Sequence, residues 1–379
     1  MKILFLNFAG LRFNVATPDN EPLGGTESSV CYLARQLAIN GHDVTLIARL
    51  PENSPGAIMG IRHFPVVTIK DQNFFTTEKF DVLVTCNTPI VAPHLRQMSP
   101  HSFNLTWVHM APDQQAVQEL GDRDVLRSMD GIIYVSEWQK TETEKKFGIN
   151  KESCVIGNGL TPAFENMFAS SQELLKIKEN RAAYTSTPYR GLLPLLNVMD
   201  GMRQETELDV FSSMRVYQRD DDDYAELYRR AAQNPRIHCH GAITQAALAQ
   251  RLRRAAFLAY PCVFAETYCL AALEAMAAGM KVISTRLGAL EATTMGYADL
   301  IPVGTASGDD LVPAFRKAME KNIAEFQAHS EAWAEKMFEQ ASAVNRECSW
   351  AVRAKIWEKR LTSRQMQFVG GNLFIVHNN

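Results

Sequence analysis

This sequence lacks the cysteine spacing of a disulfide framework or a zinc site. Its seven cysteines are scattered, are odd in number and contain no Cys-x2-Cys pair. Disulfide scaffolds and structural zinc sites space their cysteines in close, paired patterns. We therefore expect reduced, buried thiols in a cytoplasmic protein.

Long apolar runs and a strong charge of one sign are also absent. A membrane-spanning helix needs about 18 or more consecutive apolar residues. No run in this sequence is that long, so we expect no transmembrane segment. Residues 2–8 are apolar but carry one basic residue and lead to no cleavage site, which favours a first β-strand over a signal peptide. The net charge of −3 gives no basic surface for nucleic acid.

The chain contains no internal repeat and no low-complexity segment. Its composition is that of an ordinary globular protein, with 46% hydrophobic residues. A single core stops growing at about 250–300 residues. A length of 379 residues therefore predicts two domains.

Short apolar runs alternate with helical segments, and this rhythm predicts an α/β fold with parallel sheets. The first strand is followed by a loop with Gly24-Gly25, a helix over residues 26–39 and a strand over 44–48. This opening is Rossmann-like, but it lacks the Gly-x-Gly-x-x-Gly spacing. Further strands are expected at residues 66–69, 80–86, 104–109, 131–135, 154–156, 208–211 and 214–217.

The most informative stretch is residues 264–279, which lies between two strand-like runs. Its Ala, Leu and Met residues favour a helix beginning at Tyr268, and Gly279 is suited to end it. The first-turn amides of Tyr268, Cys269 and Leu270 then have no intrahelical partner and form an anion site.

Two carboxylates accompany this helix start. Glu266 precedes the helix and Glu274 lies about two turns further on. A carboxylate repels phosphate, whereas its oxygens accept hydrogen bonds from sugar or ribose hydroxyls. The plainer alternative is that Glu266 caps the helix and Glu274 is a solvated helix residue.

Glu266 and Glu274 stand in the run Ala-Glu-Thr-Tyr-Cys-Leu-Ala-Ala-Leu-Glu-Ala-Met-Ala-Ala-Gly, which is followed by Val-Ile-Ser-Thr-Arg-Leu-Gly-Ala-Leu-Glu. With seven residues between the two acids, it resembles the Glu-x7-Glu signature of retaining GT-B glycosyltransferases, the large family 4 group. The resemblance spans about residues 2–361. It implies two Rossmann-like domains facing across a cleft, and transfer of a sugar from a nucleoside diphosphate to an acceptor hydroxyl.

The resemblance also divides the chain into parts. It implies an acceptor-side Rossmann-like domain over residues 1–160, a linker over 161–180 and a nucleotide-sugar-binding domain over 181–348. A helix over residues 349–361 is expected to cross back onto the first domain. The tail, residues 362–379, is uninformative.

Carried over to this chain, the family's site implies Glu266 and His109 as the residues nearest the transferred sugar. His109 directly follows an apolar strand, where a structural histidine is the competing interpretation. The Gly24-Gly25 pair alone also fits an ordinary loop end. The implied donor-binding positions are Gly24, Gly25, Arg190, Gly241, Ala242, Ile243, Tyr268, Cys269, Leu270 and Glu274.

One position departs from the family pattern. The family commonly holds the pyrophosphate with an Arg and, after four intervening residues, a Lys-Gly pair. Arg190-Gly191 can fill the second role, because a guanidinium is a good phosphate partner. Thr185 stands where the first cation is expected. The departure puts either the phosphate geometry or the full activity in question.

The resemblance implies no metal and no cofactor, only the nucleotide sugar as co-substrate. The acidic run from Asp220 to Asp223 suggests a metal site, but it opens a helix, where acids suit the N-terminal dipole. His238 and His240 suggest a metal as well, but no further ligand clusters with them.

Two other functions stay open. One is a sugar-nucleotide 2-epimerase of the same fold, and the other is a catalytically weak sugar-nucleotide-binding partner subunit, which Thr185 suggests. Residues 1–160 carry 14 Lys and Arg against 17 Asp and Glu. Because anionic bilayers attract basic clusters, a soluble acceptor is favoured over a lipid. The nucleotide, the sugar, the acceptor and the oligomeric state are not indicated.

Overall fold

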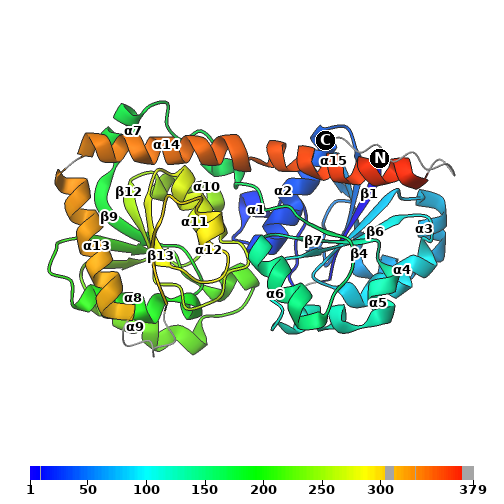
Figure 1. Ribbon diagram of the computed structural model, residues 1–379, viewed down its shortest axis with the longest axis horizontal. Helices are drawn as coiled ribbons and strands as arrows, with labels where there is room; N and C mark the ends of the chain where they lie inside the picture. Colours follow the sequence, from blue (N-terminus) through cyan, green and yellow to red (C-terminus); the bar gives the residue numbers. More distant parts are fainter. Residues whose placement is uncertain (9, 304–310, 329, 369–379) are drawn as a thin grey trace.

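Two parallel β-sheets, each flanked by helices, lie side by side in this protein (Figure 1). The computed structural model describes residues 1–8, 10–303, 311–328 and 330–368. Each sheet has its own hydrophobic core, as expected for a chain too long for one core. The predicted α/β class with two Rossmann-like domains is confirmed.

The first sheet has the strand order β3-β4-β2-β1-β5-β6-β7-β8, and all neighbours are parallel except β3 and β4. Its strands are nearly continuous apolar runs because helices cover both faces. The strands are β1 Lys2–Asn7, β2 Asp43–Ala48, β3 Ala57–Ile58, β4 Ile61–Pro65, β5 Val82–Cys86, β6 Phe103–Val108, β7 Gly131–Tyr134 and β8 Ser153–Val155. The α-helices are α1 Thr17–Asn20, α2 Gly25–Ile39, α3 Gln72–Glu78, α4 Ala92–Met98, α5 Arg123–Ser128 and α6 Glu137–Phe147.

The second sheet is wholly parallel, with the order β11-β10-β9-β12-β13-β14. Its strands are β9 Glu179–Tyr184, β10 Glu207–Val210, β11 Ile237–Cys239, β12 Ala255–Tyr260, β13 Lys281–Thr285 and β14 Asp299–Ile301. The α-helices of this half are α7 Ser171–Ile177, α8 Leu192–Asp200, α9 Ala225–Gln233, α10 Gln245–Leu252, α11 Leu270–Ala277, α12 Leu290–Thr293, α13 Leu311–Ala328 and α14 Ser330–Cys348.

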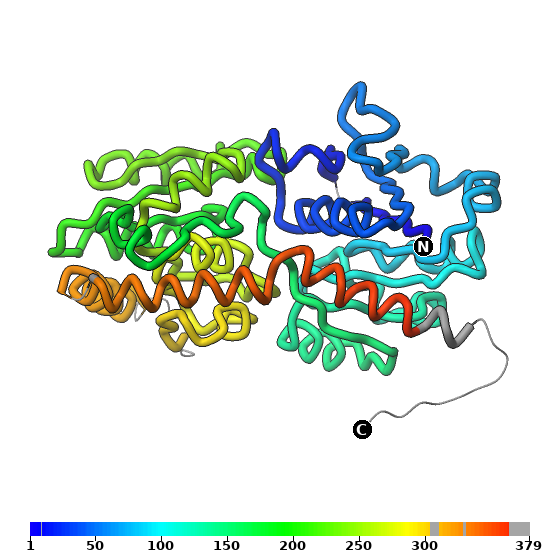
Figure 2. The backbone as a smooth tube through the Cα atoms, turned by 90° about the horizontal axis from the view of Figure 1, so that it is seen from above, coloured from blue at the N-terminus to red at the C-terminus, as the bar shows by residue number. Residues whose placement is uncertain are grey.

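The chain passes between the two domains twice. It leaves the first domain after β8, and Phe164, Phe168 and Leu174 from the expected linker pack into the second core. It returns where α14 gives way to α15 (Trp350–Phe368), and these two helices run almost end to end along the whole molecule (Figures 1 and 2). Residues 369–379 of the expected tail lie outside the described residues.

Helix α15 is held on the first domain by aromatic packing. Trp357 is fully buried and meets the Trp107 ring edge-on, with 5.0 Å between ring centroids. Trp350, Ala354 and Leu361 belong to the same core. Burying side chains of this size stabilises the docked helix by several kcal/mol in total, at about 1.5–3 kcal/mol each.

Two predicted strands are wrong. Residues 66–69 form part of a 3-10 helix, η1 (Val66–Lys70), and β4 takes the neighbouring place in the sheet. Residues 214–217 form another 3-10 helix, η6 (Met214–Tyr217). Here Ser213 Oγ accepts from the Arg215 amide and Asp221 accepts from the Met214 amide. Such side-chain bonds to the backbone compete with sheet pairing, and an apolar pattern does not reveal them.

Glycines at the first crossing leave room for aromatic side chains. A Cβ on Gly159 would lie 2.4 Å from Cδ2 of Trp350, and a Cβ on Gly157 would lie 2.8 Å from Cε2 of Tyr268. The connecting chain can therefore pass directly beneath both rings. A side chain at either position would push the two crossings apart.

We predict that Gly159→Ala destabilises the protein by about 1–3 kcal/mol, because the added methyl overpacks against the Trp350 ring. Urea unfolding followed by tryptophan fluorescence measures the loss. Gly56→Ala is the matched control, since a Cβ there meets no atom within 4 Å. Equal stability of the two variants would show that the close approach of Trp350 is not a constraint.

Candidate active site

A cavity of about 450 Å³ lies between the two domains and is lined by both. Parallel strands of both sheets end at it, and ligands of open α/β sheets bind at this edge. All twelve predicted site residues line this one cavity: Gly24, Gly25, His109, Arg190, Gly241, Ala242, Ile243, Glu266, Tyr268, Cys269, Leu270 and Glu274.

Helix α11 begins at Leu270, with Cys269 as its N-cap, two residues later than predicted. Its first-turn amides are therefore those of Leu270 and the residues after it, and they have no intrahelical acceptor. The cavity wall at this point includes Cys269, Leu270 and Ala271. The predicted anion site is shifted by half a turn but still lies at the cavity.

The loop before α11 is held by Gly288. The Ala289 amide donates to the Glu266 carbonyl at 2.7 Å, and Glu266 forms a parallel bridge with Gly288. Gly288 has φ +63°, and a Cβ there would lie 2.3 Å from the Glu266 carbonyl oxygen. Only glycine meets both conditions without strain. This contact fixes the backbone that carries Glu266.

The Glu266 carboxylate is almost fully buried and is paired with a cation. Arg190 Nη1 donates to both carboxylate oxygens, at 2.7 and 2.8 Å, and the Tyr260 hydroxyl donates to Oε1 at 2.5 Å. Burial alone would lower the pKa of Arg190, but the Glu266 carboxylate raises it above its ordinary value. The predicted phosphate cation and the predicted sugar-binding carboxylate are thus partners of each other.

Glu274 is 5% exposed and comes from the middle of α11. Its Oε1 accepts from the Thr161 hydroxyl at 2.6 Å, across the first crossing of the chain. Burial raises the pKa of Glu274 from the ordinary 4.5 to about 7, and the Thr161 bond only partly offsets this shift. It is therefore a buried carboxyl at the cavity and not a solvated helix residue.

His109 follows β6 and is buried between protein groups. Its Nε2 lies 3.1 Å from Asn158 Oδ1, and its Nδ1 lies 3.5 Å from Cys86 Sγ. Burial lowers the pKa of His109 to about 3, so the ring is neutral at physiological pH. Its carbonyl accepts from the Thr267 hydroxyl at 2.6 Å, which joins the first domain to the loop after Glu266.

The Gly24-Gly25 pair begins α2, with Gly24 as its N-cap. A Cβ on Gly25 would lie 3.0 Å from Leu270 Cδ1, so the glycine lets α2 approach α11 of the other domain. A Cβ on Gly24 would lie 2.7 Å from Glu27 Oε2. These contacts explain why two glycines stand at this helix start.

Sequence reasoning missed Glu27 as part of the site. Glu27 is 5% exposed, lines the cavity and is hydrogen-bonded to Asn7. Burial raises the pKa of its carboxyl above the ordinary value. An acid in the first turn of a helix is common for reasons of the dipole alone. Its position two residues after Gly25 was the available signal.

The histidines and aspartates considered for a metal have other partners. Asp221 accepts from the Ser213 hydroxyl at 2.6 Å, and His240 Nε2 lies 2.8 Å from Asp209 Oδ1. His238 Nε2 lies 3.5 Å from Glu207. Within residues 1–8, 10–303, 311–328 and 330–368, no group of three or more His, Cys, Asp or Glu side chains has the geometry of a metal site.

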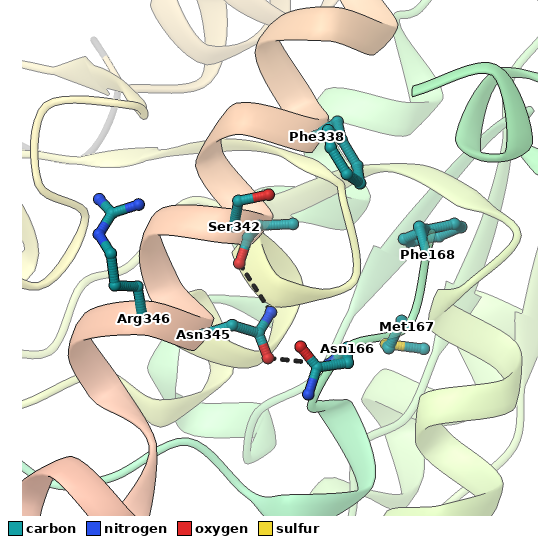
Figure 3. A pocket seen from close by; sticks show the side chains of 8 residues that line it. Asn166, Met167, Phe168, Phe338, Ser342, Asn345 and Arg346 are labelled. Carbon is teal, nitrogen blue, oxygen red and sulfur yellow. Dashed lines mark hydrogen bonds between the residues drawn. The ribbon is translucent and has the colours of Figure 1, made fainter. Parts of the chain in front are cut away.

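A second hollow, of about 390 Å³, lies between α14 and residues 166–168 (Figure 3). Asn345 spans it, accepting from the Asn166 amide at 2.8 Å and donating to the Ala341 carbonyl at 2.7 Å. None of the predicted site residues lines it. We assign this hollow to the packing of α14 and place the candidate active site in the interdomain cavity.

Two family models match the chain, one in each domain. The model of Glycosyltransferase Family 4 matches residues 23–164, and that of Glycosyl transferases group 1 matches residues 183–323. Together the two matched ranges cover more than half of the chain, and residues of both ranges line the cavity. The chain belongs to the GT-B glycosyltransferases of the family 4 type.

Solved structures agree with this fold. The chain resembles a sucrose-phosphate synthase from Thermosynechococcus elongatus at 17% identity and TM-score 0.72, covering 98% of this chain and 100% of that one. A glycosyltransferase from Rickettsia africae matches at 14% identity and TM-score 0.72, covering 97% and 100%. Anabaena HepE in complex with UDP and glucose matches at 14% and 0.68, covering 96% and 100%. No curated protein matches the sequence.

No helix in the described part of this glycosyltransferase is both long enough and apolar enough to span a membrane. All seven cysteines are free thiols.

We predict a pH-dependent stability difference for Glu274→Gln. Because the native pKa of Glu274, about 7, exceeds the ordinary 4.5, the native state binds the proton more tightly than the unfolded chain. Below about pH 4.5 the carboxyl of Glu274 is protonated in both states and does not lower the free energy of unfolding. As the pH rises, its burial lowers the free energy of unfolding more and more, up to a maximum above about pH 7. The stability of Glu274→Gln relative to wild type should rise by about 1–3 kcal/mol between pH 5 and pH 8.

Urea unfolding at both pH values measures this difference. Glu226→Gln is the control, since that side chain is 78% exposed on α9. A relative stability of Glu274→Gln that is equal at pH 5 and pH 8 would contradict the raised pKa.

Proposed function

We propose that this glycosyltransferase moves a sugar from a nucleoside diphosphate sugar to an acceptor hydroxyl, with retention of anomeric configuration. The observation that carries the proposal is the convergence, in one interdomain cavity, of the α11 N-terminus with the buried carboxyls of Glu266 and Glu274. Amides suit a diphosphate and carboxylates suit sugar hydroxyls, so the pair fits a nucleotide sugar. The UDP and UDP-glucose complexes of Anabaena HepE support this donor class.

The donor is proposed to lie along α11. The amides at Cys269 and Leu270, with those at Gly24 and Gly25 opposite, face the diphosphate, and Tyr268 completes this wall. Glu274 takes the ribose hydroxyls. The nucleobase lies against Gly241, Ala242 and Ile243, which share the wall with the ring of Phe211. Gly241 has φ +68°, and a Cβ there would meet no atom within 4 Å, so its backbone is open to the cavity.

The chemical step requires stabilisation of the charge that develops on the leaving diphosphate. Preorganised amides at a helix start provide this without reorganisation. Glu266 is proposed to hold the sugar hydroxyls and orient the reacting carbon, with His109 beside the sugar from the first domain. The leaving phosphate accepts the acceptor's proton, so no separate base is needed. In this proposal the reaction uses no metal ion.

We predict that Glu266→Ala lowers turnover by well over about tenfold, within the range of one electrostatic group. Glu274→Ala should mainly raise the donor dissociation constant, by about tenfold, since a charge-assisted hydrogen bond to ribose is lost. Initial rates and calorimetric donor titrations separate the two effects. Glu226→Ala on exposed α9 is the control. Wild-type activity in both cavity variants would overturn the site.

The donor can be found by thermal-shift screening with UDP, GDP, ADP and dTDP sugars, because a ligand that binds only the native state raises the melting temperature. Product analysis with donor alone tests the alternative of a 2-epimerase, which needs no acceptor. A donor that binds but is neither hydrolysed nor transferred to any acceptor would favour a partner subunit, the alternative suggested by Thr185.

The acceptor is proposed to be soluble, given the excess of acidic over basic residues in residues 1–160. Co-sedimentation with anionic liposomes would show this to be wrong. The seven free thiols support the proposal that the protein works in the cytoplasm.

A further inference from the structure

We propose that Arg190 is a positioning residue for Glu266 and not a ligand of the diphosphate. This inference rests on the proposed function, because it assigns the charges within the same donor site. It revises the role that family resemblance gives to Arg190, from phosphate cation to the partner that orients and neutralises the sugar-binding carboxylate.

The guanidinium of Arg190 is already occupied by protein groups. Nη1 donates to both oxygens of Glu266, Nη2 lies 3.4 Å from the Tyr217 hydroxyl, and Nε lies 3.4 Å from the Tyr189 hydroxyl. One face of the guanidinium lies over the Phe264 ring, 4.5 Å from its centroid. A phosphate would have to displace the tyrosine hydroxyls from Nη2 and Nε, since Nη1 is held by Glu266 in a charge-assisted pair that is largely shielded from water.

The backbone of Arg190 is joined to the same loop as its side chain. The Val263 amide donates to the Arg190 carbonyl at 3.0 Å. Gly191 has φ +153°, and a Cβ there would lie 2.5 Å from the Pro261 carbonyl oxygen. The turn that carries Arg190 therefore packs directly on the loop that carries Glu266. Both main-chain and side-chain contacts fix one residue relative to the other.

Glu266 needs such a partner. Its side chain is 5% exposed, and an unpaired carboxylate in that position would repel a bound diphosphate. The Tyr260 hydroxyl donates to Glu266 and lies 3.3 Å from the Ser186 hydroxyl, which extends the network along the cavity wall. With Arg190 in place the pair is neutral, and the carboxylate keeps one orientation toward the sugar.

The remaining donors for the diphosphate are then uncharged. Among the described residues that line the cavity, Arg190 is the one Arg or Lys. Thr185, where the family has its first cation, lines the same cavity, and its hydroxyl is buried without a hydrogen-bond partner among the described residues. The α11 amides, the amides at Gly24 and Gly25, and cavity-lining hydroxyls such as those of Thr185 and Thr187 are then the groups that can meet the phosphate oxygens.

A double-mutant cycle of Arg190→Gln and Glu266→Gln tests the proposal. Titrations with UDP, GDP, ADP and dTDP identify the nucleoside diphosphate that wild type binds, and its dissociation constant is then measured for both single variants and the double variant. Arg190→Gln alone leaves a buried carboxylate unpaired and can fail to fold. The double variant removes both charges together, so the decisive comparison is between Glu266→Gln and the double variant.

If Arg190 acts through Glu266, adding Arg190→Gln to Glu266→Gln changes the dissociation constant by no more than about twofold. A direct phosphate contact is charge-assisted, and its loss in that background would weaken binding by about tenfold or more. A loss above about threefold overturns the proposal. Arg253→Gln, which removes the partner of Glu173 outside the cavity, is the control for general loss of charge.

A kinetic measurement distinguishes positioning from a merely structural role. Arg190→Lys, which keeps the charge but not the planar geometry, should lower kcat by about tenfold or more while KM for the donor stays within about twofold. A raised KM with unchanged kcat overturns the proposal. If wild type binds none of the four diphosphates, the donor proposal itself fails. This result differs from the one that overturns the role of Arg190, in which wild type binds a diphosphate and the double variant binds it more weakly than Glu266→Gln does.

Discussion

The buried pair of Glu266 and Arg190 is the interaction on which the site depends. A carboxylate with almost no contact to water is stable in this fold only because a cation and the Tyr260 hydroxyl lie within hydrogen-bond distance. The two residues come from different segments: Gly191 lets the turn of Arg190 approach Pro261 in the loop of Glu266, and Gly288 packs on the backbone of Glu266 from the other side of that loop. A chemical requirement for one charged group at the cavity thus dictates the backbone conformation of two separate loops.

Much of this architecture can be predicted from local sequence. Apolar runs of four to six residues locate most strands, and Gly24-Gly25 locates the start of α2. The errors arise where side chains bond to the backbone nearby. At Met214, bonds from Ser213 and Asp221 favour a 3-10 turn over the strand that the apolar residues suggest. Such competition depends on geometry and is invisible to periodicity.

The candidate site, like the fold, was predicted from the sequence only in part. The spacing of Glu266 and Glu274 identifies both carboxyls, because their chemistry is local to one loop and one helix. Their partners are not local: Arg190 is 76 residues from Glu266, and Thr161 is 113 residues from Glu274. Glu27 was missed because its burial depends on tertiary contacts, which include the hydrogen bond to Asn7 at the end of β1. A single sequence identifies the groups but not which charges neutralise each other.

The two crossings of the chain have a mechanical consequence. Two rigid bodies joined at two separate points can turn relative to each other only about the line through those points. Here one point is the turn at Gly159 and the other is the junction at Trp350, and the two are in contact. The hydrogen bond from the Thr267 hydroxyl to the His109 carbonyl is a third link between the domains, placed beside the cavity, and it opposes rotation about that line.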